Sequence, residues 1–409
     1  MIELINKIRY LIDAKSKKYL ILLSILLIIA TFLEVFGLGI ILPLISIIID
    51  PDYLESNKYL LKFQSFFGNI SKLSFINYLL FFIVLLYFLK SIFIVSVVFV
   101  QNKLLNNIKV LLSNKLFHRY IFSDYSFLLK HNSSILIKNI QTEVGIFQSF
   151  CSSLISLTVE SFTISSIILV LLFIDPLGII VTSFFLTLFS ALFFYFTKKK
   201  IHKYGIIREV FDKGLSKTLI ESFDGIKTFK IMNKENFIYE NFSRFNIGRS
   251  KIQIKYEFLN QIPRFYLEFL SITGLIIYIL YALNIANTPY KDLVITLGVF
   301  VAAVFKILPS FNKIISVSQN LKYNTPSINL LHKEFLQINH SGNDHSYEVE
   351  KFIFKNHISV VDLNYRYSEK SNLILKNIDL KINKGDCIGV FGKSGGGKST
   401  FIDIFCGLL

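Results

Sequence analysis

The chain has 409 residues, of which 53% are hydrophobic and only 18% are charged. Soluble domains average about 45–50% apolar and about 25% charged residues, so both values disfavour a water-soluble enzyme. The high content of Ile, Leu and Phe also excludes a disordered chain. The formal net charge of +16 is explained better by basic cytoplasmic loops of a membrane protein than by nucleic-acid binding. We therefore expect a multi-pass membrane protein without a nucleic-acid partner.

Residues 1–18 precede the first apolar run. Their apolar members recur at helical spacing with basic residues between them, which suits a helix lying in the membrane interface. An ordinary lead-in to the first membrane span explains the same pattern. Both interpretations stay open at this point.

Six apolar segments are candidates for crossing a membrane, which takes about 20 residues. They are Tyr19–Ile49, Phe75–Val100, Leu154–Ile174, Leu177–Phe196, Phe265–Leu283 and Leu293–Leu308. The third and fourth are separated only by Asp175-Pro176, which predicts a helical hairpin. These segments predict an α-helical membrane domain of six transmembrane helices over residues 19–325.

Basic residues predict the orientation of these helices. Residues 197–256 hold 14 Lys or Arg and 6 Asp or Glu, whereas residues 50–74 hold three of each kind. Because cytoplasmic loops are enriched in Lys and Arg, both termini are expected in the cytoplasm and the protein in the cytoplasmic membrane.

Two further patterns concern the connections between spans. Apolar residues recur at helical spacing through Leu104–Phe127 and Leu219–Phe242, which predicts helices that continue past the bilayer and are joined by short crossing segments. On the other side, Tyr59–Ile70 is consistent with an amphipathic outer helix or with a packed capping loop.

Ionisable residues occur inside the predicted spans, where each costs about 2.5–3.5 kcal/mol on insertion scales. Arg264 and Glu268 stand four residues apart and can pair on one helix face. As a set the residues predict a polar path that would attract an anionic headgroup, although a structural pair or a snorkelling lysine explains any single one. The set is Glu34, Lys90, Glu160, Arg264, Glu268 and Lys306.

The composition changes near the C-terminus. Residues 326–353 are predicted to be a linker, and residues 354–409 the N-terminal part of an α/β nucleotide-binding domain. Alternation of Ile378, Leu380 and Ile382 with polar residues predicts a strand, and Cys387–Phe391 predicts a buried strand.

The second of these strands leads into a phosphate-binding motif, G-x-x-x-x-G-K-[ST], which predicts ATP as a ligand with Mg²⁺. Its glycines let backbone N–H groups converge on phosphate oxygens. Lys398 is expected to reach the β- and γ-phosphates, and the Ser399 hydroxyl to ligate Mg²⁺. The predicted nucleotide-binding residues of the loop are Gly392, Ser394, Gly395, Gly396, Gly397, Lys398, Ser399 and Thr400.

Spans followed by this motif resemble an ABC exporter half-transporter. Ser394–Thr400 is similar to the Walker A sequence of that family, and Val361–Leu363 with Tyr365–Tyr367 to its first strand and A-loop. The resemblance implies that the Tyr367 ring stacks on adenine, with Tyr365 as the rival for that role.

Two cytoplasmic segments resemble the coupling regions of the family. Glu221–Lys230 is similar to the second region and Ser123-Asp124-Tyr125 to the first. The resemblance implies that Asp124, Tyr125, Asp224 and Gly225 pass nucleotide-dependent motion to the helices.

Within the family, three segments resemble PglK-type flippases of lipid-linked oligosaccharides, namely Phe32–Glu34, Pro263–Glu268 and Leu308–Lys313. This implies an ATP-driven flippase for a lipid-linked oligosaccharide or a similar amphiphile, working as a homodimer or beside a complete half-transporter. An ABC exporter of a lipid, a peptide or a drug is the alternative.

The hydrolytic motifs of the family, which are the Q-loop, the signature sequence, the Walker B pair and the switch histidine, follow the phosphate loop. The sequence given stops at Leu409 before any of them, so it holds no catalytic residue for hydrolysis. By itself it is expected not to hydrolyse ATP at a useful rate. A non-hydrolysing membrane-domain fragment that associates with a complete half-transporter is therefore a second hypothesis.

Overall fold

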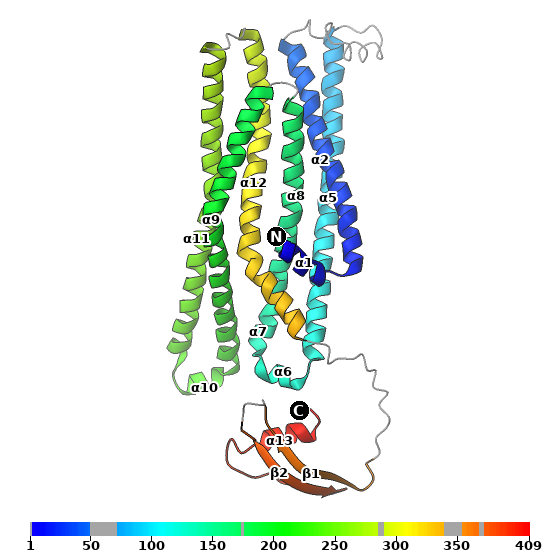
Figure 1. The fold of residues 1–409 in the computed structure, drawn as a ribbon, viewed down its shortest axis with the longest axis vertical. Coiled ribbons are helices and arrows are strands. Elements are labelled where there is room, and N and C mark those ends of the chain that lie inside the picture. The colour runs from blue at the N-terminus through cyan, green and yellow to red at the C-terminus, as the bar shows by residue number, and fades with distance from the viewer. Residues whose placement is uncertain (1, 50–71, 173–175, 285–289, 339–353, 368–371) are drawn as a thin grey trace. The chain divides into compact units, whose positions relative to one another are not determined.

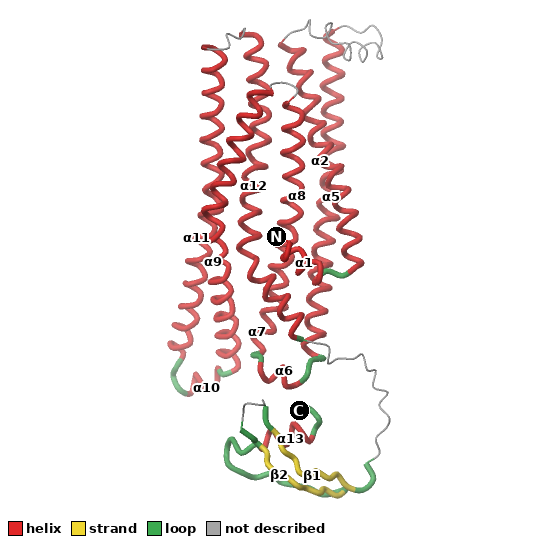
Figure 2. Tube along the Cα trace, viewed as in Figure 1, coloured by secondary structure: helices red, strands yellow, loops and turns green. Residues whose placement is uncertain are grey.

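The computed structural model describes residues 2–49, 72–172, 176–284, 290–338, 354–367 and 372–409. Long helices make up the part before residue 338, and a two-stranded sheet with helix α13 (Lys398–Phe405) follows (Figures 1 and 2). The chain forms two compact units, Met1–Lys115 with Ile137–Glu334, and Leu116–Leu136 with Phe335–Leu409. The predicted outer element at Tyr59–Ile70 lies outside the described residues.

The helices before residue 338 follow one another with short connections. The long ones are α2 (Ala14–Ile49), α5 (Lys72–Ile121), α8 (Val144–Leu172), α9 (Pro176–Asp224), α11 (Glu235–Asn284) and α12 (Tyr290–Gln337). The short ones are α1 (Ile2–Leu11), α6 (Tyr125–Lys130), α7 (Ser133–Lys138) and α10 (Ile226–Ile231).

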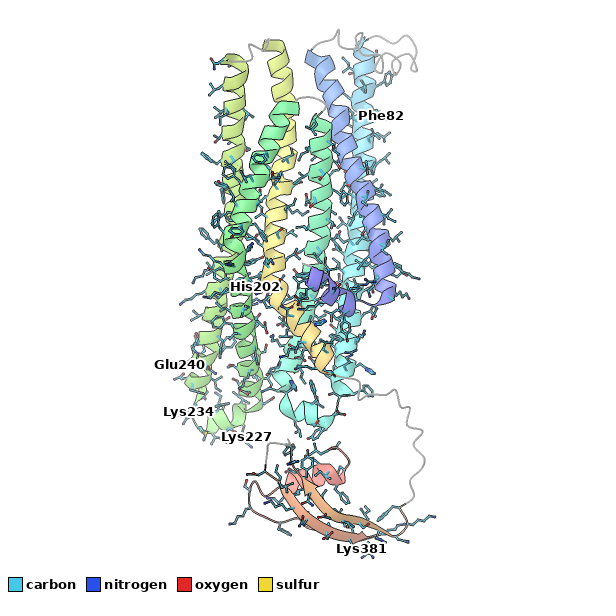
Figure 3. All side chains as sticks on the ribbon, in the orientation of Figure 1. Phe82, His202, Lys227, Lys234, Glu240 and Lys381 are labelled. Carbon is cyan, nitrogen blue, oxygen red and sulfur yellow. The ribbon has the colours of Figure 1, made fainter. Side chains whose placement is uncertain are left out.

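Three segments in the described part are long and apolar enough to cross a membrane, namely Ala14–Glu34, Ile76–Ile121 and Ser133–Leu169. Their apolar side chains are largely exposed, as Phe82 on α5 illustrates (Figure 3). The remaining predicted spans lie within α9, α11 and α12, and their membrane crossing stays a prediction.

Helix length supports the predicted continuation past the bilayer. Helices α5 and α11 each have 50 residues, which at about 1.5 Å per residue is roughly 75 Å. The hydrocarbon core of a bilayer is only about 30 Å thick. A helix that crosses it once therefore continues well beyond it, and the helical pattern predicted from Leu104 is confirmed as far as Ile121.

Short crossing segments join these long helices, as the sequence predicts. Helix α6 follows Asp124, whose extended ψ of 140° ends the preceding turn, and α10 follows Gly225 directly after α9. Each has six residues, so each turns the chain by a single short helix.

The predicted linker begins too early. Helix α12 continues to Gln337, so residues 326–337 are helical, and Ile338 is the first residue beyond the helix. The buried side chains of Ile328, Leu331 and Phe335 recur at helical spacing and give this part of α12 an apolar face. A Pro at 326 and several polar residues conceal that face in the sequence.

A π-helical turn interrupts the run from α7 to α8. It covers Asn139–Glu143 and lies between Lys138 and Val144. Because a π turn bonds residue i to residue i+5, it brings Lys138 and Glu143 onto one face. Lys138 Nζ lies 2.8 Å from Glu143 Oε1, and the two side chains are 1% and 0% exposed. The π turn and this buried ion pair therefore depend on each other.

We expect Lys138→Met or Glu143→Leu alone to destabilise the protein by about 3–5 kcal/mol, because each leaves a buried charge without its partner. The double variant should recover most of that loss, since it buries no charge. Thermal unfolding of the purified protein in detergent measures the three changes. A double variant that is as unstable as the sum of the singles would contradict the coupling.

The C-terminal sheet is an antiparallel pair. Strand β1 (His357–Tyr365) bonds to β2 (Leu375–Asn383), with Ile358 opposite Ile382 and Val360 opposite Leu380 (Figure 2). Both strands coincide with segments that the sequence predicts to be extended.

The prediction of a buried strand at Cys387–Phe391 is wrong for the described residues. This segment has no strand pairing there, and Phe391 is 93% exposed. An apolar run becomes a central strand only when neighbours bond to it on both sides and cover its faces. The two strands in the described part bond to each other and leave this segment uncovered.

Candidate functional site

The phosphate loop turns tightly between Gly392 and helix α13. Gly395 and Gly397 both have a φ of +82°, a left-handed conformation that favours glycine. A Cβ on Gly397 would also lie 2.9 Å from Leu375 Cδ2 on β2. Glycine at 397 thus lets the loop pass close to the sheet and begin α13.

The side chain of Lys398 folds back across this loop. Its Nζ donates hydrogen bonds of 2.8 Å to the carbonyl oxygens of Gly392 and Lys393. The ammonium group is therefore held inside the curve of the loop, beside the N–H groups at the start of α13. Positive charge and converging N–H donors are what a polyphosphate requires.

Two tyrosines at the end of β1 lie next to this loop: Tyr365 is the last residue of the strand, and Tyr367 follows it. The hydroxyl groups of Tyr367 and Thr400 are hydrogen-bonded at 3.0 Å, and the Tyr365 ring meets the Tyr367 ring edge-on at 5.3 Å. Tyr367 is thereby fixed to the first turn of α13, while Tyr365 supports its ring. Adenine stacking by Tyr367 and Mg²⁺ binding by Ser399, the second residue of α13, stay predictions.

The predicted pair within α11 is confirmed. Arg264 Nε donates a 3.0 Å hydrogen bond to Glu268 Oε1, and the two side chains are 68% and 47% exposed. Elsewhere on the predicted path, Lys90 Nζ lies 4.7 Å from the ring centre of Tyr87 on the same helix. The Lys306 side chain is outside the described residues, and Glu34 is half-buried on α2.

An ion pair between helices gives Glu160 a partner that the sequence does not reveal. Lys313 Nζ on α12 lies 2.7 Å from Glu160 Oε1 on α8, where the carboxylate is 11% exposed. Beside it, Ile164, Leu267, Phe311 and Ile315 form a buried apolar cluster. The pair thus neutralises a charge that would otherwise be costly among apolar side chains.

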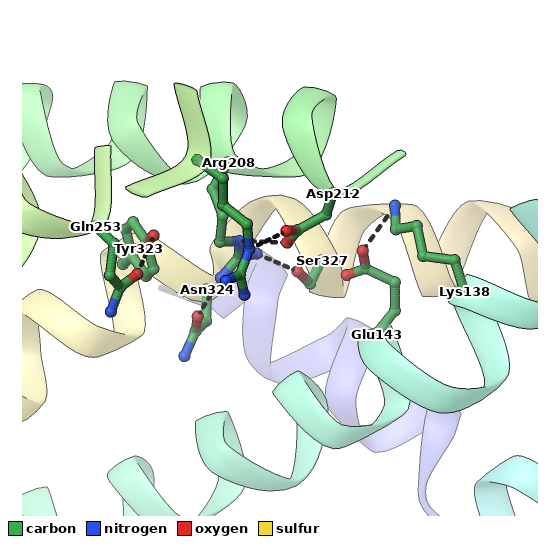
Figure 4. Close-up of polar contacts among 9 residues, drawn as sticks. Lys138, Glu143, Arg208, Asp212, Gln253, Tyr323, Asn324 and Ser327 are labelled. Atoms are coloured by element: carbon green, nitrogen blue, oxygen red, sulfur yellow. Dashed lines mark hydrogen bonds and ion pairs between the residues drawn. The ribbon is translucent and has the colours of Figure 1, made fainter. Parts of the chain in front are cut away.

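The most extensive polar contacts join α9, α11 and α12 around Arg208 (Figure 4). Its terminal nitrogens donate to Asn324 Oδ1 at 2.9 Å and to Ser327 Oγ at 2.7 Å. Its Nε lies 3.6 Å from Asp212, which accepts a 2.6 Å hydrogen bond from Arg249. Arg208 and Asp212 are 5% and 7% exposed, so these charges are neutralised inside the protein. We call these five residues the Arg208 joint.

Aromatic stacking continues the Arg208 joint toward α11. The Arg208 guanidinium lies 4.7 Å from the ring centre of Tyr323, which stacks on Tyr256 at 3.9 Å. Burial, with a smaller effect of Tyr323, raises the pKa of Tyr256 to about 12, so its hydroxyl stays neutral. On α9, a Cβ at Gly205 would collide with the carbonyl oxygen of Tyr323, which shows how closely the two backbones approach.

Two carboxylates compete for the buried lysine at the π turn. Burial is the main cause that raises the pKa of Glu209 on α9, and Glu143 raises it further while Lys138 lowers it. Lys138 therefore contributes to the charge balance of α9 as well as to the π turn of the neighbouring helix.

A side chain of α12 contacts the carbonyl group that a proline of α11 leaves without its helical donor. Pro263 has no N–H, so it cannot donate to the carbonyl of Leu259 four residues earlier. The fully buried Gln319 donates from Nε2 to that carbonyl oxygen at 3.4 Å. The side chain of one helix thus replaces the backbone hydrogen bond that the proline removes from the other.

We expect Gln319→Leu to destabilise the wild-type protein more than it destabilises the Pro263→Ala variant. In that variant the alanine N–H can donate to the Leu259 carbonyl, so the contact from Gln319 is no longer needed. A lost buried partner costs about 1–3 kcal/mol, which sets the scale of the difference. Thermal unfolding of the two single variants and the double variant measures it. Equal costs in both backgrounds would mean that Gln319 does not replace the backbone donor that Pro263 lacks.

The sequence could not reveal most of these contacts. Arg208 and Asp212 are recognisable as an i, i+4 pair, but Asn324 and Ser327 lie more than a hundred residues away. The predicted coupling residues fall where the crossing helices begin, with Asp124 and Tyr125 at α6 and Asp224 and Gly225 at α10. Their role in coupling stays a prediction.

Comparison with known proteins gives two family matches. A model described as an ABC transporter transmembrane region matches residues 19–308, and one described as an ABC transporter matches residues 375–409. The second match contains the phosphate loop and implies ATP binding.

Individual relatives match over parts of their length. The chain is 22% identical over 300 residues to the ATP-dependent lipid A-core flippase of Syntrophus aciditrophicus (strain SB), which is 72% of this chain and 48% of that protein. It is 54% identical over 43 residues to the alpha-hemolysin translocation ATP-binding protein HlyB of Escherichia coli O157:H7, covering 10% of this chain and 6% of the relative. The lipoprotein-releasing system ATP-binding protein LolD of Buchnera aphidicola subsp. Acyrthosiphon pisum (strain APS) is 45% identical over 53 residues, covering 12% and 23%. The chain thus spans less than half of each of these relatives.

Proposed function

This chain belongs to the family of ABC transporter transmembrane regions, and on that premise we propose that it is a subunit of an ATP-driven flippase. The subunit crosses the cytoplasmic membrane six times with both termini in the cytoplasm and works as a homodimer. Its substrate is a lipid-linked oligosaccharide or a similar amphiphile. The observation that carries the proposal is a glycine-rich loop with an inward-held Lys398, in a chain whose long helices include three apolar enough to cross a membrane.

ATP would bind with its phosphates in the curve of this loop. Lys398 would exchange its two carbonyl acceptors for phosphate oxygens, Ser399 would hold Mg²⁺, and Tyr367 would stack on the base. A Mg²⁺ ion held by Ser399 would neutralise part of the phosphate charge. Because Thr400 already fixes Tyr367 beside α13, the aromatic surface and the phosphate loop would bind the nucleotide as one unit.

Motion would then pass to the helices through the crossing segments. Helices α6 and α10 are short and end in irregular turns, while the helices that they join continue for tens of residues. A displacement at Asp124 or Gly225 would therefore be carried along rigid rods. The Arg208 joint would make α9, α11 and α12 move together.

We expect Lys398→Ala in the full-length transporter to abolish ATP-driven lipid transport and to weaken ATP binding by about tenfold or more. The reason is that hydrogen bonds to charged groups contribute about 1.5–3 kcal/mol. Binding of a fluorescent ATP analogue and lipid flipping in proteoliposomes measure the two effects.

Lys393→Ala is the matched control for this variant. Lys393 belongs to the same loop, but its side chain is exposed and only its backbone carbonyl binds Lys398. Its substitution should leave ATP binding close to the wild-type value. Undiminished transport by Lys398→Ala would refute the assignment of the loop.

An anionic lipid headgroup has an available cation on α11. Glu268 accepts only from Nε of Arg264, and a guanidinium has five N–H donors, so its terminal nitrogens keep donors for a second anion. A pyrophosphate could bind there without displacing Glu268, which would keep the guanidinium in place. The relative described as a lipid A-core flippase also favours a lipid-type substrate.

We expect Arg264→Ala to slow flipping of a pyrophosphate-linked lipid, since the headgroup loses a cation. Glu268→Ala is the comparison, because it breaks the same pair but keeps the positive charge. Flipping rates in proteoliposomes distinguish the roles. If the two variants lose the same fraction of activity, Arg264 serves only as the structural partner of Glu268.

A further inference from the structure

We propose that the first turns of the protein form a binding site for anionic phospholipid headgroups and that this site stabilises the end of α12. The site consists of Arg9 on α1 with Lys15 and Lys18 at the start of α2, and we call it the basic rim. The proposal rests on the membrane placement of α2 and is independent of the transported substrate.

The acidic residues nearby are already neutralised. Glu3 pairs with Lys7 at 2.7 Å, and Asp13 pairs with Lys115 on α5 at 3.2 Å. Arg9, Lys15 and Lys18 are exposed, and no ion pair joins them to another described residue. Helix α1 and the first turn of α2 therefore carry an uncompensated positive charge.

The basic rim directly borders an apolar surface. Lys15, Lys18, Leu22, Ile25 and Ile29 recur along one face of α2, and the three apolar residues are 54%, 51% and 44% exposed. A lipid whose chains lie along this apolar face would place its phosphate beside the two lysines.

Two exposed tyrosines lie beside the basic rim in the sequence. Tyr19 follows Lys18 and is 52% exposed, and Tyr10 on α1 is 48% exposed. Tyrosine is enriched where hydrocarbon meets headgroups. The other face of α1 is buried through Ile8 and Leu11, so the helix is fixed to the protein while its exposed face borders the lipid.

Two contacts connect α1 to α12. Lys7 Nζ donates to Asn329 Oδ1 at 2.9 Å, and the Tyr10 ring meets the His332 ring edge-on at 5.4 Å. Lys7 and Tyr10 flank Arg9 in the sequence, so a headgroup that immobilises Arg9 also restrains both contacts. Residues 329–332 lie in the last three turns of α12, which ends at Gln337.

The first test measures lipid preference. The full-length protein is placed in nanodiscs of phosphatidylcholine with and without phosphatidylglycerol, and spin-labelled lipids report the bound fraction. Arg9→Gln/Lys15→Gln/Lys18→Gln should lower the preference for phosphatidylglycerol by about tenfold or more, because each basic residue near an anionic surface contributes roughly fivefold.

The matched control removes the same charge elsewhere. Lys234 directly precedes α11, Lys251 and Lys255 lie in its first half, and all three are exposed; Lys234 is labelled in Figure 3. Their triple substitution by Gln should leave the lipid preference unchanged. Equal losses in the two triple variants would show a general charge effect and overturn the site. The preference for phosphatidylglycerol should also persist in Lys398→Ala, which is expected to abolish ATP-driven transport. A loss of lipid preference can therefore be distinguished from a failure of the proposed function.

The second test measures the connection to α12. Hydrogen exchange of residues 325–337 should slow several-fold when phosphatidylglycerol is present. Asn329→Leu should keep the lipid preference but lose much of this protection, because the Lys7 contact is gone. Protection that is the same without phosphatidylglycerol, or that survives in the basic-rim variant, would overturn the connection.

Discussion

A guanidinium group removed from water needs a partner for its charge and acceptors for its donors, and Arg208 finds the first on its own helix and acceptors for its terminal nitrogens on a neighbouring one. Asp212 supplies the negative charge from α9, while Asn324 and Ser327 accept hydrogen bonds from α12. Arg249 brings α11 to the same carboxylate. A movement that separates these helices would remove the α12 acceptors from Arg208 and the Arg249 partner from Asp212, although the Arg208–Asp212 pair within α9 would remain. The parts of α9, α11 and α12 around the Arg208 joint are therefore held together at this level.

Close backbone approach and a hydrogen bond from a side chain hold α11 and α12 to their neighbours beyond the Arg208 joint as well. At Gly205 the absence of a Cβ lets α9 approach Tyr323. At Pro263 the helix loses a hydrogen bond, and Gln319 supplies a replacement from its neighbour. The turn at Pro263 is thus stabilised by a contact between helices, whereas an ordinary helical turn is stabilised within itself. The stability of α11 at this turn therefore depends on its contact with α12.

The sequence predicts what is encoded locally. The phosphate loop, strand β2 and the continuation of α5 follow from motif spacing and periodicity, strand β1 from a resemblance to the family's first strand, and the Arg264–Glu268 pair from a separation of four residues. It does not reveal partners far apart in the chain, such as Lys313 for Glu160. It also places the linker too early, because Pro326 and polar residues such as Asn329 and Lys333 interrupt the apolar pattern of this part of α12, whose Ile328, Leu331 and Phe335 are buried. The run Cys387–Phe391 is apolar enough for a central strand, but strand formation depends on neighbours.

The two ion pairs of the apolar helices differ in how much of the charge remains available to a ligand. Glu160 and Lys313 neutralise each other beside an apolar cluster, so that pair costs little and offers little to a ligand. Arg264 keeps most of its surface exposed and uses one donor for Glu268. A carboxylate that occupies only Nε holds the guanidinium in a fixed orientation without consuming its capacity to bind an anion. Glu268 would therefore act as a positioning residue for a headgroup site, and the exposed terminal nitrogens of Arg264 would determine that the bound group is anionic.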